Sequence, residues 1–324
     1  MKVGARIGLP IGKATRNAFG EALRDLGHEY PNIVVVDGDV HNSTRTGYFA
    51  KEFPDRFFNL GIAESNMVGV AAGLAASGKI AFVSSFACFI MCNAFDQLRM
   101  SVAFPRQNVK VVGSHAGISI GEDGPSQMGI EDVALALALP GFAVFSPADE
   151  HAARALTRHM VETEGPAYMR TGRPDFPVVY QPESEFVVGR ANRLRDGGDL
   201  TIVASGLMVA AGLEAAYLLS QDGIEARVLD MHTIRPLDEE AIEAAARETG
   251  CIVTAEEHLL AGGMGQQVAT VAARTHPVPM GFVGLDNTYA TSGSTDALLE
   301  RYGLTADHIA QKAREALSHK QRPR

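Results

Sequence analysis

Short apolar runs of strand length alternate with helical patterns through most of this 324-residue sequence. Residues 33–36 and 80–83 are two such runs, and apolar residues recur at helical spacing over 14–26. Strands that are apolar on both faces and separated by helices are typical of a parallel sheet covered on both sides. The sequence therefore predicts an α/β fold built on parallel sheets.

The length and a change in composition predict two domains. A chain of this length suits two units of about 150 residues each. Residues 174–198 are rich in Pro, Glu and Arg and lack a strong period, so we interpret 173–189 as the crossing between the domains. We expect one α/β domain over residues 1–180 and a second over residues 190–324.

The composition argues against several kinds of partner. The formal net charge of −9 disfavours binding to nucleic acid or to an anionic membrane, although a local basic site can still bind an anionic substrate. No window is long and apolar enough to span a membrane, and residues 1–10 lack the apolar core of a secretion signal. The three cysteines, Cys88, Cys92 and Cys251, form no disulfide framework and suit a reducing compartment. We therefore expect a cytoplasmic protein.

A glutamate at the start of an uncharged helix is the first candidate for a functional residue. The pattern predicts a short strand over 57–60, a break at Gly61 and a helix that begins near Glu64. Residues 67–76 carry no charge, which predicts a helix buried on all sides. A carboxylate at the mouth of such a helix is shielded from water and suits holding or sharing a proton. The alternative is that Glu64 only complements the positive end of the helix dipole.

A long glycine-rich loop over residues 113–127 is the second candidate site. It contains four glycines together with His115, Glu122, Asp123 and Gln127, and it lies between two predicted buried elements. Long irregular loops in compact domains are usually functional or disordered, and residues of restricted geometry favour function here. The alternative is a structural loop whose polar groups cap neighbouring helices.

Both segments resemble the transketolase family, and the resemblance extends over nearly the whole chain. Residues 58–67 resemble the family's pyrimidine-binding domain, and the run Gly-Glu-Asp-Gly-Pro at 121–125 with the upstream His115 closely resembles a family signature. The resemblance implies a pyrimidine-binding domain followed by a transketolase C-terminal domain. It also implies thiamine diphosphate as the cofactor.

The resemblance implies roles for four residues around the cofactor. Glu64 would hydrogen-bond N1′ of the aminopyrimidine and share its proton during catalysis. Phe86 and Phe89, three apart on a predicted helix, would pack on the aminopyrimidine ring, although aromatic residues at that spacing are also common in cores. Asp39 matches a family aspartate close to the cofactor.

The same resemblance implies that a sugar phosphate binds Arg16, Ser43, His115, Asp123, Gln127 and Arg173. His115, with Glu64 the second candidate catalytic residue, would face the phosphate end, and Asp123 would accept a sugar hydroxyl. Arginine suits this role because its planar fork meets phosphate oxygens with two hydrogen bonds, whereas the alternative is an ordinary surface arginine. Gln127 stands where animal transketolases carry glutamine and microbial and plant ones usually carry histidine, so an amide replaces a titratable group.

The family's metal-binding motif is missing from the sequence. That motif, Gly-Asp-Gly followed by a later asparagine, binds the divalent metal on the diphosphate, whereas this chain has Asp-Gly-Asp at 37–39. Cys88 and Cys92 have no further ligands near them in the sequence, so we expect no metal site in the chain. The resemblance implies a split enzyme in which a separate N-terminal subunit supplies the ligands for Mg²⁺ or Ca²⁺ and for the diphosphate. We expect an α2β2 assembly and no activity from this chain alone.

The implied activity is the transfer of a two-carbon ketol unit from a ketose phosphate to an aldose phosphate in carbohydrate metabolism, as in the pentose phosphate pathway. Two related thiamine enzymes are alternatives, the β subunit of a 2-oxo acid dehydrogenase and a deoxyxylulose-phosphate-synthase-like enzyme. A third alternative is a split transketolase that acts on an unusual sugar, in catabolism or secondary metabolism, and a fourth is a non-catalytic homologue that completes the fold of a partner. The signature at 121–125 disfavours the dehydrogenase, and the joint presence of Glu64, His115, Asp123 and Arg173 disfavours a scaffold.

Overall fold

Seven strands form the larger of two sheets in the computed structural model, which describes residues 3–320. The order is β10-β5-β6-β4-β3-β1-β2, and all neighbours are parallel except β10, which pairs antiparallel with β5. The strands are β1 (Ile33–Asp37), β2 (Phe57–Asn59), β3 (Ile80–Phe86), β4 (Val109–Ser114), β5 (Ala143–Phe145), β6 (Ala167–Arg170) and β10 (Thr233–Arg235).

Helices cover both faces of this sheet because successive strand residues point to opposite sides. In β1, Val34 and Val36 belong to one apolar core, and Ile33 and Val35 belong to the other. The first core is covered by α4 (Glu64–Ala76), α5 (Ala87–Asn93) and α7 (Asp132–Leu137), and the second by α1 (Thr15–Glu29), α3 (Gly47–Glu52) and α8 (Glu150–Glu162). The shorter elements are η1 (Ala5–Ile7), α2 (His41–Thr44), η2 (Pro54–Arg56), α6 (Phe95–Gln97), the π-helix η3 (Leu98–Ala103) and η4 (Pro125–Gln127).

The second domain repeats this plan around a five-stranded sheet of order β12-β11-β8-β9-β7. Its strands are β7 (Asn192–Arg195), β8 (Leu200–Ala204), β9 (Ala226–Asp230), β11 (Ile252–Leu259) and β12 (Met280–Leu285), of which only β7 is antiparallel to its neighbour. Its helices are α9 (Met208–Gln221), α10 (Glu239–Thr249), α11 (Met264–Thr275), α12 (Thr295–Arg301) and α13 (Ala306–Ser318). The α/β prediction with two mostly parallel sheets is confirmed.

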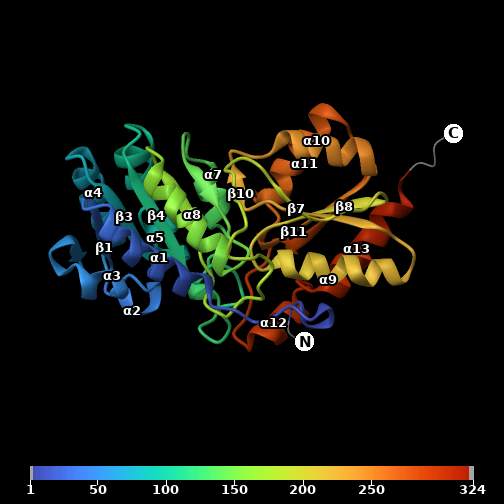
Figure 1. The fold of residues 1–324 in the computed structure, drawn as a ribbon, viewed down its shortest axis with the longest axis horizontal. Helices are drawn as coiled ribbons and strands as arrows, with labels where there is room; N and C mark the ends of the chain where they lie inside the picture. The colour runs from blue at the N-terminus through green and yellow to red at the C-terminus, as the bar shows by residue number, and fades with distance from the viewer. Residues whose placement is uncertain (1–2, 321–324) are drawn as a thin grey trace.

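Each half of the sequence contributes a segment to the other half. Figure 1 shows the two domains side by side, with β10 between them and the N-terminal end of the chain beside α12. The backbone N–H of Ser146 donates to the carbonyl of His232 next to β10, at 2.9 Å. In the other direction, the N–H of Gly4 donates to Glu214 on α9 at 2.6 Å. One apolar core also contains residues of both domains, among them Val111 and Val203.

Two local predictions are wrong. Helix α4 is not buried on all sides, because it is the outermost layer over the sheet and its outer face, with Asn66, Gly69 and Gly73, is exposed. Phe86 does not begin a helix; it is the last residue of β3 and is aligned with Ser114 of β4. A helix without charged residues can be buried on all sides only if another element packs on its outer face, and no described element covers that face of α4. None of the helices within residues 3–320 is long and apolar enough to cross a bilayer.

Candidate active site

Most of the candidate residues gather at the carboxyl edge of the larger sheet. Strand β3 ends at Phe86, β4 leads into His115, and β6 leads towards Arg173. The N-terminus of α1 reaches the same edge, because the N–H of Gly172 donates to Thr15 Oγ1 at 2.7 Å. Parallel strands present their carboxyl ends together, and open α/β sheets bind ligands at that edge.

Glu64 is buried at this edge with one carboxylate oxygen in use. It is the first residue of α4 and only 5% exposed, and its Oε1 accepts a hydrogen bond from Ser85 Oγ at 3.0 Å. Ser85 directly precedes Phe86, so the carboxylate lies beside the end of β3. Its Oε2 accepts no hydrogen bond from the described residues, so that oxygen is available to a donor from a ligand.

Three flat rings are stacked at the end of β3, directly after Ser85, the hydrogen-bond partner of Glu64. The rings of Phe86 and Phe89 lie 5.5 Å apart at an interplanar angle of 5°. The His115 ring lies 3.8 Å from the Phe86 ring at 13°. Phe86 is buried and Phe89 is half-buried, so Phe89 is the phenylalanine with more ring surface open to a ligand. A flat apolar surface beside a carboxylate suits a planar heterocycle that carries a hydrogen-bonding nitrogen.

His115 is held as a neutral imidazole. Burial, together with the positive charges of Arg16, Arg173 and Arg45, lowers the pKa of His115 to about 3. Arg16 Nη1 lies 3.0 Å from Nε2, and because a guanidinium can only donate, Nε2 is the acceptor. The proton then belongs on Nδ1, which lies 2.8 Å from Ser114 Oγ. The network therefore selects one tautomer of His115.

Arg16 is the centre of a cationic cluster. Its Nη1 also donates to the carbonyl of Ser43 at 3.0 Å, and its buried Nε has no hydrogen-bond partner in the part of the chain described. Burial and the neighbouring charges of Arg45 and Arg173 lower the pKa of Arg16 to about 10, so it stays charged at neutral pH. An anion bound between these arginines would relieve their repulsion and pair with the free Nε–H.

Arg173 connects this cluster to the glycine-rich loop. Its Nη1 donates to the carbonyl of Ile120 at 2.9 Å and to Asp123 Oδ1 at 3.0 Å. A pocket of about 360 Å³ opens here, lined by Arg16, Ser119, Ile120, Gly121, Glu122, Arg173, Pro174, Gly293, Ser294 and Thr295. The second domain therefore forms one wall of the pocket that contains the two arginines.

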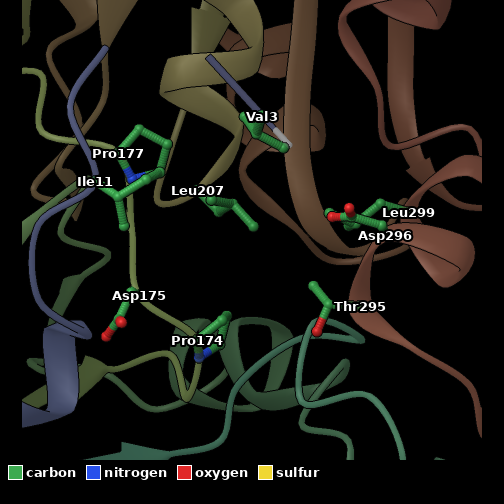
Figure 2. A pocket seen from close by; sticks show the side chains of 9 residues that line it. All are labelled: Val3, Ile11, Pro174, Asp175, Pro177, Leu207, Thr295, Asp296 and Leu299. Atoms are coloured by element: carbon green, nitrogen blue, oxygen red, sulfur yellow. The ribbon is translucent and has the colours of Figure 1, made fainter. Parts of the chain in front are cut away.

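A second, more apolar pocket adjoins the first. Its volume is about 270 Å³, and it shares Pro174 and Thr295 with the arginine-lined pocket. Figure 2 shows these two residues on the lower side of the pocket, with Val3, Leu207 and Leu299 above them. The N-terminal segment, the interdomain crossing and α12 thus meet beside the cationic cluster.

Two candidate residues stand apart from this hydrogen-bonded group. Asp39 is exposed, and its Oδ1 accepts from Asn59 Nδ2 at 2.8 Å. Gln127 lies in η4, where its side chain makes no hydrogen bond within residues 3–320. Over the same residues, no three His, Cys, Asp or Glu side chains lie close enough together to hold a metal ion.

Sequence reasoning missed several residues of the site. Ser85 and Ser114 orient Glu64 and His115, but a serine within a strand carries no local sign of such a role. Thr295 comes from the other domain, so no pattern near the loop could indicate it. Arg45 could have been found, because it is a basic residue two positions after the candidate Ser43.

Two family profiles match the chain. The profile described as "Transketolase, pyrimidine binding domain" matches residues 12–178, and "Transketolase, C-terminal domain" matches residues 189–309. Together these matches include both sheets and all the candidate residues.

Several known proteins are similar to the chain over nearly its full length. A putative transketolase C-terminal section from Methanocaldococcus jannaschii is 42% identical, over 94% of this chain and 96% of that protein. Subunits of a 6-deoxy-6-sulfo-D-fructose transketolase from Clostridium sp. and of an apulose-4-phosphate transketolase from Phocaeicola vulgatus are each 39% identical, over 94% and 93% of this chain and 95% and 97% of those proteins. A solved structure described as a split gene transketolase, inactive β4 tetramer, superimposes with a TM-score of 0.90 at 47% identity, covering 96% of this chain and 100% of that one.

Proposed function

The chain belongs to the transketolase family, as the C-terminal subunit of a split enzyme, and we propose that it transfers a two-carbon ketol unit from a ketose phosphate to an aldose phosphate with thiamine diphosphate. The observation that carries this proposal is the placement of a buried glutamate, stacked rings and a cationic cluster at one sheet edge. We assign the activity to cytoplasmic carbohydrate metabolism.

The residues at this edge fit the aminopyrimidine end of thiamine diphosphate. Glu64 has a free oxygen, Ser85 fixes its other oxygen, and Phe89 offers ring surface next to Phe86 at the end of the same strand. The bound cofactor would supply the carbon that accepts and releases the two-carbon unit. Glu64 would hold or move a proton at Oε2, next to a ring nitrogen, while the aromatic pair keeps water away from it.

The cationic cluster supports a substrate with an anionic end. Arg16 and Arg173 line the pocket and supply its positive charge. His115 is neutral, so it would contact an anionic group through hydrogen bonding and not through charge. The names of two relatives specify a sugar phosphate and a sulfonated sugar, both of which carry an anionic end. Asp123, paired with Arg173 at the pocket, would accept a hydrogen bond from a sugar hydroxyl.

We infer that a separate N-terminal subunit completes the site. It would bring the ligands for the diphosphate and for Mg²⁺ or Ca²⁺, in an α2β2 assembly. This inference is supported by relatives that are themselves described as sections or subunits of transketolases, and by the solved split-gene tetramer that is described as inactive.

Reconstitution is the direct test of the proposal. We expect the purified chain to show no ketol transfer alone, and to gain it when mixed with its N-terminal partner, thiamine diphosphate and Mg²⁺, because each half holds only part of the site. The measurement is the appearance of the product sugar phosphates from a ketose phosphate and an aldose phosphate. Turnover by the chain alone would contradict the split site, and CO₂ release from a 2-oxo acid by the complex would indicate a dehydrogenase component instead.

Arg16→Ala should raise KM for a ketose phosphate by about ten- to a hundredfold in the reconstituted enzyme, because a hydrogen bond to a charged group contributes about 1.5–3 kcal/mol. kcat should change less, since Arg16 does not contact the reacting carbon in this proposal. Steady-state kinetics with a ketose phosphate and with the same ketose lacking its phosphate would check the prediction. The effect should vanish for the uncharged sugar.

The matched control for Arg16 is Arg158→Ala. Arg158 lies on α8 of the same domain, where it pairs with Glu29 at 2.7 Å on the surface. Its removal should leave KM unchanged for both sugars. An equal rise in KM for the charged and uncharged ketose in Arg16→Ala would show that Arg16 does not bind the anion.

A further inference from the structure

Three consecutive buried ionisable residues lie near the end of strand β11 in the second domain. Glu256, Glu257 and His258 are 1%, 6% and 0% exposed. Because neighbouring strand residues point to opposite faces, the two glutamates reach different partners. Glu256 accepts from the backbone N–H groups of Met264 and Gly265, at 2.8 and 2.7 Å, and so binds the start of α11 within its own domain.

Glu257 instead reaches out of its domain into the glycine-rich loop. Its Oε1 accepts from the N–H of Ser119 at 2.5 Å, and its Oε2 accepts from Ser119 Oγ at 3.2 Å. Gly117 has a φ of +82°, and a Cβ atom at this position would collide with the Glu257 carboxylate. The loop backbone is therefore shaped to receive this one side chain.

A second residue of the same domain binds the remaining polar group of Ser119. Thr295 Oγ1 donates to the Ser119 carbonyl at 2.8 Å. Figure 2 shows Thr295 on the side of the apolar pocket where Pro174 also lies. Ser119 is thus held at its N–H, its hydroxyl and its carbonyl by two side chains of the second domain. It lies in the sequence between His115 and Asp123, the loop residues assigned to the substrate.

The end of β11 is itself fixed against the first domain. Arg170, the last residue of β6, donates from both Nη atoms to the Glu257 carbonyl at 3.1 Å and from Nη2 to the Gly129 carbonyl at 3.0 Å. Gly129 lies just beyond the loop, so Arg170 fixes the distance between β11 and the C-terminal end of the loop.

We propose that Glu257 is a positioning residue through which the second domain holds the glycine-rich loop in the geometry that binds the sugar, with Thr295 as its second contact. Glu257 touches neither substrate nor cofactor in this proposal, which rests on the proposed function. The second domain thereby acts on catalysis through the shape of a loop in the first.

Amide hydrogen exchange of the intact chain tests the contact without any activity. Glu257→Ala should speed exchange over residues 115–127 by about tenfold or more, because the loop loses its buried acceptor. Glu257→Gln, whose amide oxygen still accepts from one donor, should lie between the alanine variant and the natural chain. Glu256→Gln is the matched control, and it should speed exchange only at the start of α11.

Kinetics of the reconstituted enzyme test the consequence. Glu257→Ala should lower kcat/KM about tenfold, mainly through KM for the ketose phosphate, with unchanged affinity for thiamine diphosphate. Thr295→Val removes the second contact without touching the buried carboxylate, and it should shift the loop exchange and KM in the same direction. Thr270→Val, which removes a comparable hydroxyl from α11, should shift neither.

The outcomes separate this proposal from the proposed function. Unchanged loop exchange in both Glu257→Ala and Thr295→Val would overturn the positioning role, whatever reaction the enzyme catalyses. Equal effects of Glu256→Gln and Glu257→Gln on the loop would overturn it too, because they would indicate general destabilisation. Faster exchange with unaltered KM would also overturn it. If the complex of unmodified chains showed no ketol transfer, the proposed function would be refuted, and the positioning role of Glu257 would still be tested by the loop exchange.

Discussion

Replacing Glu64 by glutamine should leave the fold intact and lower kcat of the reconstituted enzyme by about 10³-fold, within the range of acid–base catalysis. The amide has the same shape, and its oxygen can still accept the hydrogen bond that Ser85 Oγ donates at 3.0 Å. The amide group cannot take up or release a proton at the place of Glu64 Oε2, next to which the cofactor's ring nitrogen would lie. The measurements are kcat with a ketose phosphate and the melting temperature of the chain.

Glu150→Gln is the matched control for this variant. Glu150 is the first residue of α8, as Glu64 is of α4, so both carboxylates complement a helix dipole. If the dipole were the whole role of Glu64, both variants would lose about 0.3–1 kcal/mol of stability and no activity. We expect that pattern only for Glu150→Gln. A Glu64→Gln enzyme that retains most of its kcat would remove Glu64 from the mechanism.

Arg170→Met should lower the free energy of unfolding by about 3–5 kcal/mol, because it leaves a buried charge without its partner. Arg170 Nη2 donates to Asp132 Oδ1 at 3.1 Å, and its Nε lies 3.0 Å from Oδ2 without the angle of a hydrogen bond. Tyr168 also donates to Asp132, at 2.6 Å. Burial and the neighbouring Asp132 raise the pKa of Tyr168, so it stays a neutral donor that cannot replace the guanidinium. Urea unfolding of the chain measures the loss.

Two further variants show whether the loss comes from the buried pair. Arg158→Met removes an arginine from an exposed pair with Glu29 and should change the unfolding free energy by less than about 1 kcal/mol. Adding Asp132→Asn to Arg170→Met should recover part of the loss, since the carboxylate that lost its partner is then removed as well. A loss below about 1 kcal/mol in Arg170→Met would mean that Asp132 is neutralised in another way.

Local sequence pattern predicts the fold class of this chain well, because a strand that is buried on both faces is a continuous run of apolar residues. The strand at Ile33–Asp37 and the helix at Glu150–Glu162 follow directly from apolar runs and helical spacing. Boundaries are harder. Phe86 belongs to β3 rather than to the helix after it, because its pairing with β4 is set by a partner 28 residues away.

The candidate site divides in the same way. Arg16, Ser43 and His115 could be named from short motifs, and the structure brings them within hydrogen-bond distance of one another through Arg16. The residues that orient them could not be named. Glu257 reaches Ser119 across 138 positions of sequence, and a buried glutamate on a strand looks, from its neighbours alone, like any other. Contacts of that range depend on how the two domains pack, which no local period encodes.

The two sheets suggest that the chain could be cut into two fragments at the interdomain crossing, but the antiparallel strand β10 argues against such a cut. Residues 233–235 pair with the free edge of β5, although they belong to the later half of the sequence. A fragment truncated at the interdomain crossing would leave the N–H and C=O groups along this edge of β5 unpaired and exposed. Such fragments would adhere to each other through these strands, so truncation at this point invites aggregation or the exchange of strands between copies.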